Sequence, residues 1–179
     1  RTITSSLSDI HGAITGAIAS LKGPLHGGAN EEVMHMMNKI KAPEKAHKWI
    51  NNALDKKEVV MGFGHRVYKK GDSRVPTMEK YFRKVSNAKH DKKFVKIYDI
   101  VKNVMIEKKN IHPNVDYPTG PTYHLMGFDT DFFTPIFVIS RITGWSAHVM
   151  EQHTANKLIR PLSKYTGSDH RKVLLLSQR

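Results

Sequence analysis

The amino-acid sequence predicts an all-α protein, and three observations carry this prediction. Across most of the 179 residues, apolar side chains recur at the spacing of an α-helix. No alternation of apolar and polar residues, which would indicate a β-strand, persists beyond a few positions. Glycine and proline gather between the periodic segments, where helices are expected to stop. With 39% hydrophobic residues, the chain is long enough and apolar enough to bury a core.

The first part of the chain predicts three helices. The first covers residues 3–21, and its apolar stripe consists of Ile3, Leu7, Ile10, Ile14, Ile18 and Leu21. Lysine, glycine and proline at 22–24 end this helix. Asn30 is expected to cap the second helix, because its side chain can accept a hydrogen bond from a free N–H of the first turn. Pro43 is expected to open the third, since the first helical position needs no N–H donor.

Two irregular loops interrupt the rest of the pattern. Residues 59–74, VVMGFGHRVYKKGDSR, break the helical period and contain three glycines. Residues 110–122, NIHPNVDYPTGPT, contain three prolines and form the second expected loop. The remaining helices are expected at residues 76–85, 94–105, 120–127 and 134–152. The chain after residue 154 is expected to be a polar, basic tail with one short apolar run.

The net charge of +13 raises the question of nucleic-acid binding. The lysines are spread along the chain as doublets on the polar faces of the expected helices, and no arginine–aromatic stacking motif accompanies them. We therefore expect solvated lysine faces and no nucleic acid as a partner, with local attraction of an anionic small molecule as an additional role. A basic helical nucleic-acid binder is kept as a remote alternative.

Several other classes of protein are not expected. The sequence contains no cysteine, which excludes disulfides and cysteine-ligated zinc. The most apolar stretch, residues 132–150, contains Pro135, Arg141 and His148, so we interpret it as a buried helix and expect a cytoplasmic protein without a membrane span. His148 and His153 are five residues apart, which does not place two ligands on one helix face, so no metal is expected. The segment GFGHRV has only two glycines of the dinucleotide-binding fingerprint.

Three ionisable residues lie in the breaks between helices. His26 lies in KGPLHGGAN (22–30), His65 in the glycine-rich loop and Asp116 in the proline-rich loop. Two imidazoles and a carboxylate can remove a proton and stabilise the charge that forms. The glycines beside His26 are expected to let another molecule approach the main chain; the alternative is an ordinary turn with a solvated histidine. Four arginines could bind carboxylates through paired hydrogen bonds: Arg66, Arg74, Arg141 and Arg160.

Five blocks of the sequence, in their order and spacing, resemble citrate synthases over essentially the whole chain. The blocks are LKGPLHGGANEEV, VVMGFGHRVYKKGDSR, HPNVDYPTGPTYHLMG, FFTPIFVISRITGWSAHVMEQ and NKLIRPLSKYTG. The resemblance implies the citrate synthase fold and an acyltransferase that condenses acetyl-CoA with oxaloacetate to citrate and free CoA. The family includes 2-methylcitrate synthases, which take propionyl-CoA and give 2-methylcitrate. The segments DYPTGP and NKLIRP look closer to those members.

The resemblance also implies catalytic roles. His26 matches the histidine that donates a hydrogen bond to the thioester oxygen while the acyl-CoA becomes an enol. Asp116 matches the base that removes the α-proton. His65 matches the group that polarises and protonates the oxaloacetate carbonyl. These roles agree with the chemistry, because an α-proton beside a thioester is too weakly acidic for a carboxylate that is not positioned.

Substrate-binding residues are implied by the same resemblance. Arg74 and Arg141, with His65, match groups that bind oxaloacetate within one subunit. Arg160 matches an arginine that reaches into the site of the other subunit in a homodimer. Acyl-CoA is implied as a co-substrate, with no tightly bound cofactor. The residues that match the CoA site are Val60, Met61, Gly62, Phe63, Gly64 and Lys69.

The resemblance predicts three parts of the chain. Residues 1–27 are expected to form a large-domain helix and an active-site loop, residues 28–131 the small CoA-binding domain, and residues 132–179 a large-domain helix and the C-terminal tail. The chain of the family is longer, and its upstream part carries another oxaloacetate-binding histidine. We therefore expect this chain to be the C-terminal portion of such an enzyme and to be inactive alone. The alternative is a non-catalytic CoA-binding or interaction fragment.

Overall fold

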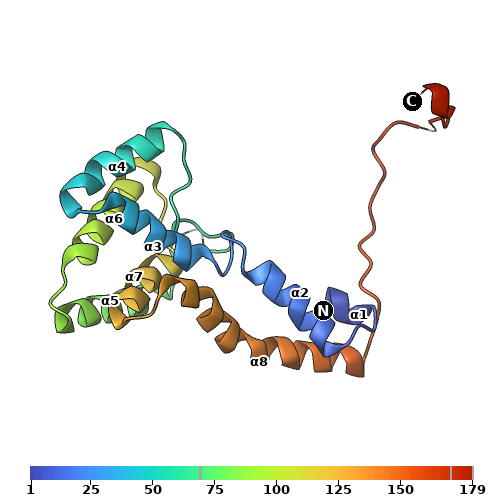
Figure 1. Cartoon of the computed structure of the whole chain (residues 1–179), viewed down its shortest axis with the longest axis horizontal. Coiled ribbons are helices and arrows are strands. Elements are labelled where there is room, and N and C mark those ends of the chain that lie inside the picture. The colour runs from blue at the N-terminus through green and yellow to red at the C-terminus, as the bar shows by residue number, and fades with distance from the viewer. Residues whose placement is uncertain (69, 170, 179) are drawn as a thin grey trace.

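The computed structural model describes residues 1–68, 70–169 and 171–178. Within these ranges every regular element is a helix, and the one β-type pairing is an isolated bridge between Phe63 and Pro113 (Figure 1). The expected all-α class is confirmed. Among the described residues, none of the helices is long and apolar enough to cross a membrane.

Most of the helices follow one another along the chain with short connections. In order they are α1 (Thr2–Ser5), α2 (Ile10–Leu21), α3 (Ala29–Ile40), α4 (Pro43–Asp55), α5 (Val75–Ala88), α6 (Lys93–Lys109), α7 (Asp116–Met126), the 3-10 helix η1 (Thr130–Phe132), α8 (Phe133–Thr154) and the 3-10 helix η2 (Leu176–Gln178). Pro43 opens α4 as the sequence predicts, because its fixed φ and missing N–H suit the first turn. The long connection between α4 and α5 is the glycine-rich loop.

The first predicted helix, over residues 3–21, is in fact two helices. The chain leaves α1 after Ser5, and Leu7 adopts a positive φ of 66°. Asp9 then accepts a hydrogen bond from the N–H of Gly12 at 2.8 Å and starts α2. A short acidic side chain can accept a hydrogen bond from a free N–H at a helix start, and this favours a new helix at Asp9 over continuation of the first one. The expectation of one helix was wrong for this reason, although the aliphatic spacing favoured it.

The start of α3 also differs from the prediction. Gly28 is the N-cap residue, and Asn30 lies inside the first turn with only 2% of its surface exposed. The turn before α3 folds closely over the end of α2. A Cβ atom on Gly27 would lie 2.4 Å from the Leu21 side chain, and one on Gly28 would lie 2.8 Å from the Lys22 carbonyl oxygen. The helix therefore begins two residues earlier than its asparagine suggests.

Helices α3 to α7 enclose the main hydrophobic core, with α3 against α7, α4 against α6 and α5 against α7 (Figure 1). Tyr98 of α6 and Tyr117 of α7 stack at its centre with ring centroids 4.4 Å apart, and the Tyr117 hydroxyl donates to the Tyr98 carbonyl at 3.1 Å. Burying aromatic rings of this size contributes several kcal/mol to folding, on the order of 2 per side chain.

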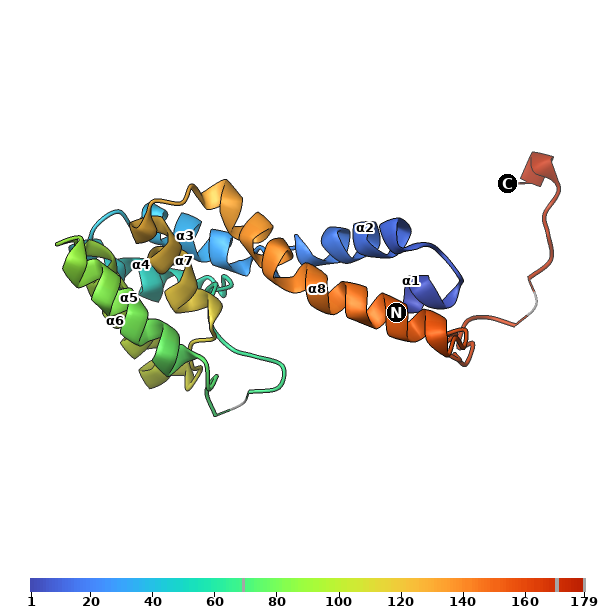
Figure 2. The same cartoon turned by 90° about the horizontal axis from the view of Figure 1, so that it is seen from below.

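Helices α1, α2 and α8 form a second group beside this core (Figures 1 and 2). Helix α2 runs along α8, and Arg1 donates to Gln152 of α8 at 3.1 Å. The two groups are joined where Glu31 of α3 accepts a hydrogen bond from the N–H of Thr134 at 2.9 Å. After α8, the Asn156 amide donates to the Ser5 carbonyl and the Ile159 N–H to the Ser5 hydroxyl, and residues 160–169 then extend away as an exposed tail. The domain limits 1–27, 28–131 and 132–179 remain a prediction.

Candidate active site

A cavity of about 380 Å³ lies where the two groups of helices meet. It contains all three ionisable residues that the sequence singled out and two of the arginines expected to bind oxaloacetate: His26, His65, Asp116, Arg74 and Arg141. The loop expected to bind CoA also lines it, with Val60, Met61, Gly62, Phe63 and Gly64. Residues from five segments of the chain therefore converge on one space, which their spacing in the sequence alone could not show.

Backbone hydrogen bonds join the glycine-rich loop to the segment before α7. The N–H of Gly64 donates to the His112 carbonyl at 2.9 Å, and the N–H of Asn114 donates to the Gly62 carbonyl at 2.9 Å. The Asn114 side-chain amide donates to the Gly64 carbonyl at 2.9 Å. These three bonds hold His65 and Asp116 in a fixed register, because each lies one or two residues beyond a bonded position.

Gly62 is required where this loop crosses the core. Its φ of 84° lies in the left-handed region, which side chains rarely adopt. A Cβ atom at this position would also lie 2.8 Å from the side chains of Tyr117 and Val33. The glycine therefore lets the loop pass close to α7 and α3, where it lines the cavity.

Asp116 is the first residue of α7 and not part of an irregular loop, as the sequence suggested. Its N–H donates to the Asn114 side chain at 3.0 Å, which starts the helix. Proline misled the prediction: Pro118 falls in the first turn, where no N–H is needed. The carboxylate of Asp116 consequently has a rigid helical backbone behind it.

The environment of Asp116 makes its carboxyl group unusually basic. Burial raises its pKa to about 6, the charge of Arg74 lowers the pKa, and the charge of Asp72 raises it. The same carboxylate, together with burial, raises the pKa of Tyr123. A base that removes a proton at neutral pH works best with a pKa close to the working pH. Asp116 is therefore suited to general-base catalysis.

The hydrogen bonds of His65 fix its tautomer. Its Nδ1 atom accepts from the backbone N–H groups of Val67 at 3.0 Å and Tyr68 at 3.1 Å. A nitrogen that accepts two hydrogen bonds carries its lone pair and no proton, so the neutral ring bears its proton on Nε2. His65 is half-buried beside the Tyr68 ring, with centroids 4.5 Å apart. A neutral His65 is therefore a hydrogen-bond donor through Nε2.

Aromatic rings support the exposed cations and the first histidine. The Arg74 guanidinium lies 5.5 Å from the centroid of the Tyr68 ring. The Arg141 guanidinium lies 4.8 Å from that of Phe137, and the His26 ring meets the same Phe137 edge-on at 5.9 Å. A cation over an aromatic face gains about 0.5–1 kcal/mol at an exposed site, which helps to hold its orientation. Phe137 thus positions one histidine and one arginine together.

The structure corrects the expected role of the glycines beside His26. Pro24, Leu25 and His26 line the cavity, whereas Gly27 and Gly28 do not. The space beside these glycines is filled by the end of α2, so they serve the tight turn and not the approach of a ligand. The turn nevertheless leaves His26 exposed at the cavity wall. The packing of Gly27 and Gly28 against the end of α2 could not be predicted from the local sequence.

One predicted residue that the structure describes does not line this cavity: Arg160 lies on the exposed tail after α8. Lys69 lies outside the described residues. Conversely, the sequence analysis missed Asn114, Asp72 and Phe137, which hold the predicted residues in place. For Asn114 a signal exists, since an asparagine side chain often accepts a hydrogen bond from a backbone N–H two residues later in a turn.

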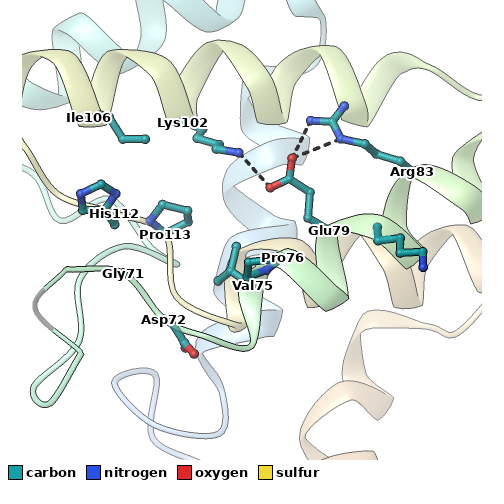
Figure 3. A pocket seen from close by; sticks show the side chains of 11 residues that line it. Gly71, Asp72, Val75, Pro76, Glu79, Arg83, Lys102, Ile106, His112 and Pro113 are labelled. Atoms are coloured by element: carbon teal, nitrogen blue, oxygen red, sulfur yellow. Dashed lines mark hydrogen bonds and ion pairs between the residues drawn. The ribbon is translucent and has the colours of Figure 1, made fainter.

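A larger cavity, of about 500 Å³, lies on the other side of these loops, between α5, α6 and residues 112–113 (Figure 3). Three of its charged groups are paired with one another. The Glu79 carboxylate accepts from Lys102 at 2.8 Å and from Arg83 at 2.7 Å. None of the residues expected to be catalytic lines it, so the smaller cavity is the better candidate for the active site.

A family model described as the C-terminal domain of citrate synthase matches residues 1–162. The chain belongs to the citrate synthase family. This membership confirms the resemblance read from the five sequence blocks. A 2-methylcitrate synthase 2 of Corynebacterium glutamicum is 59% identical over 180 residues, which cover 100% of this chain and 47% of that protein.

Other members of the family show the same extent of similarity. A citrate synthase of Mycolicibacterium smegmatis is 53% identical over 174 residues, 97% of this chain and 46% of that protein. The solved ternary complex of carboxymethyl coenzyme A and oxaloacetate with citrate synthase from Thermoplasma acidophilum has a TM-score of 0.88 at 38% identity, and the match covers 99% of this chain and 49% of that one. The chain therefore spans about half the length of the curated relatives it matches.

Proposed function

We propose that this chain forms the condensing half of an acyltransferase that joins acetyl-CoA or propionyl-CoA to oxaloacetate and releases CoA. The observation that carries the proposal is the cavity, where a carboxylate with a raised pKa, two imidazoles and two arginines converge. Such a set suits removal of a weakly acidic proton and binding of a dicarboxylate. Membership of the citrate synthase family supports it further.

The first step in this proposal is removal of the α-proton of the acyl-CoA. Asp116 takes the proton onto a carboxylate oxygen, and the electrons of the C–H bond form the enol double bond. His26 donates a hydrogen bond to the thioester oxygen as negative charge develops there. Burial of Asp116 supports this role, because its raised pKa increases the driving force for the transfer.

The second step forms the carbon–carbon bond. The enol carbon attacks the keto carbon of oxaloacetate, and the keto oxygen is polarised and protonated through Nε2 of His65. Arg74 and Arg141 bind the two carboxylates of oxaloacetate and hold the keto carbon in line with the enol. Water then hydrolyses the thioester, which releases CoA as a free thiol and citrate or 2-methylcitrate. The tautomer of His65 supports its part in this step.

Further parts of the proposal concern CoA and a second subunit. Residues 60–64 are proposed to bind the adenine of CoA, and Lys69 to meet one of its phosphates. Arg160 is proposed to complete the oxaloacetate site of the other subunit in a homodimer. Its place on the exposed tail, away from the cavity of its own chain, leaves it accessible to a neighbouring subunit.

The test is Asp116→Asn in a full-length protein that contains this chain. We expect loss of at least about 100-fold in thiol release from acetyl-CoA or propionyl-CoA with oxaloacetate, because positioned acid–base groups contribute roughly 10²–10⁴-fold. Oxaloacetate binding, measured by calorimetry, should change little. Asp131→Asn is the matched control, since Asp131 is an exposed carboxylate on η1. Turnover within about tenfold of wild type for Asp116→Asn would contradict the assignment.

A further inference from the structure

Asp72, in the loop before α5, is a buried carboxylate that the proposed reaction does not use. Its side chain is only 1% exposed. One oxygen, Oδ1, accepts from the backbone N–H of Arg74 at 3.0 Å and from its side-chain Nε at 2.9 Å. The other, Oδ2, accepts from the Arg74 Nη2 at 2.7 Å. The guanidinium is therefore held by two parallel, charge-assisted bonds, which fix its plane.

The fourth hydrogen bond of Asp72 reaches a different part of the active site. Oδ2 also accepts from the backbone N–H of Val115 at 3.0 Å. Val115 is the N-cap residue of α7, and Asp116 follows it directly. Asp72 thus satisfies a backbone donor at the start of α7 from a segment 43 residues earlier in the chain. Oδ2 of Asp72 therefore accepts hydrogen bonds both from Arg74 and from the residue directly before Asp116.

We propose that Asp72 is a positioning residue that fixes the carboxylate clamp Arg74 relative to the base Asp116. This inference rests on the proposed function, in which Arg74 binds oxaloacetate and Asp116 removes the proton. The two substrates react only when the enol carbon and the keto carbon are held at one separation and orientation. Asp72 contacts both Arg74 and the start of α7, so it sets the distance between the clamp and the base. The four hydrogen bonds that it accepts prevent its carboxylate from rotating.

The charge of Asp72 also acts on Asp116. It raises the pKa of Asp116 directly, and its pairing with Arg74 offsets the lowering effect of that guanidinium. Removing the charge at position 72 should therefore lower the pKa of Asp116. The other ionisable groups around Asp116 are Tyr123 on its own helix and, in the same cavity, His26, His65, Arg66 and Arg141. None of these changes in the variants below.

Glu79 on α5 offers a matched control. It is a paired carboxylate of the same neighbourhood, with a side chain 17% exposed, and it accepts from Arg83, Lys102 and the Tyr98 hydroxyl. Figure 3 shows the Glu79 carboxylate directed at Lys102 and Arg83, whereas the Asp72 carboxylate lies apart from them and points away from that cavity. Loss of either charge weakens the fold, but only loss of Asp72 touches the clamp and the base.

The experiment compares Asp72→Asn, Asp72→Glu and Glu79→Gln in a full-length protein that contains this chain. For Asp72→Asn we expect the KM for oxaloacetate to rise and kcat to fall, each at least about tenfold, because two charge-assisted bonds are lost. The acidic limb of its pH–rate profile should move to lower pH. Asp72→Glu keeps the charge and displaces it, so the limb should stay while kcat/KM falls at least about tenfold. Glu79→Gln should lower Tm but leave the acidic limb of the pH–rate profile and the KM for oxaloacetate unchanged.

Several outcomes would overturn the inference. Asp72 has only a structural role if Asp72→Asn lowers Tm as Glu79→Gln does but keeps the wild-type KM for oxaloacetate and the wild-type acidic limb of the pH–rate profile. If Asp72→Asn does not fold, Asp72→Glu decides, and wild-type kcat/KM in that variant refutes the positioning role. Failure of the proposed function is a separate result, since the wild-type protein would then release no thiol from acyl-CoA with oxaloacetate.

Discussion

The two groups of helices are held together in different ways. In α3–α7 the apolar residues form a continuous core, in which Ile50, Ile97 and Val101 have no exposed surface. In the group of α1, α2 and α8, Ile139 remains 72% exposed and Met150 66% exposed. Few of its apolar residues, such as Ala13 and Val149, are buried, and polar contacts such as Arg1 with Gln152 also join this group. The first group therefore has the packing of a stable unit by itself, and the second presents apolar surface to a neighbour.

This difference assigns different tasks to the two groups at the active site. The proposed base Asp116, the proposed carboxylate clamp Arg74 and His65 all belong to the compact group, where loop hydrogen bonds and the Asp72 carboxylate hold their relative positions. Arg141 lies on α8 and His26 in the turn after α2, and both contact the ring of Phe137 on α8. The proposed base and the guanidinium of Arg74 therefore belong to one unit, while His26 and Arg141 come from the second.

The largest expected effect contrasts a glycine from each group. Gly62→Ala should destabilise the protein by about 2–5 kcal/mol, because it forces a side chain into a positive φ and against Tyr117 and Val33. Gly144→Ala in α8 should instead stabilise it by about 0.5–1 kcal/mol, since a Cβ atom there meets nothing within 4 Å. Denaturant unfolding of both variants measures the contrast. Equal effects would mean that the loop is not packed as described.

The sequence contained the helices of the compact group but not their contacts. Periodic apolar residues and the proline at 43 predicted α4 and α6 well, because local preference and burial agree there. The break between α1 and α2 was missed, since one capping bond from Asp9 outweighed a regular aliphatic stripe. The start of α7 was missed because it lies among prolines that suggested a loop, although the Asn114 side chain accepts from the first N–H of the helix.

The candidate site was predictable in its residue types and not in its geometry. Family resemblance supplied His65 and Asp116, and the structure brings them to one cavity. The bonds of Asp72 to Arg74 are local, but its bond to the start of α7 has no local signal. Its partner Val115 is 43 residues away, and such a pairing depends on the packing of α5 against α7. Spacing within one segment cannot encode it.

The second prediction uses the buried charge of the compact group. The folded pKa of Asp116 is about 6, against an ordinary value of 3.8, so ionisation opposes folding. Below pH 3.8 both states are protonated and the penalty is absent; it grows between the two values and is complete above pH 6. Asp116→Asn should therefore stabilise the protein by up to about 3 kcal/mol at neutral pH, from 1.36 kcal/mol per pKa unit.

The measurement for Asp116→Asn is Tm as a function of pH. The variant should gain stability over wild type as the pH rises through 3.8 to 6, and the gain should then level off. Asp131→Asn, at an exposed position of η1, should show no such rise. A gain of the same size at every pH would show that shape, and not charge, is responsible.

The smallest expected effect on stability lies on the exposed face of α8. Ile139 and Met150 are 11 positions apart, or three helical turns, so they lie on one face, and both are largely exposed. Replacing both with Gln should change the unfolding free energy by less than about 0.5 kcal/mol per site, because neither side chain is buried. The change should act on association instead, since contiguous apolar surface drives proteins together.

Light scattering of residues 1–179 over a concentration series measures this association. We expect the wild-type chain to form assemblies larger than a monomer and the double variant to dissociate at higher concentration. Met126→Gln is the matched control from the compact group, because Met126 is 52% exposed but lies on α7, outside the exposed apolar face of α8. If Met126→Gln weakens association as much as the α8 variant, the apolar surface of α8 is not the contact. The contrast between a self-sufficient core and a helix pair that needs a neighbour would then have to be given up.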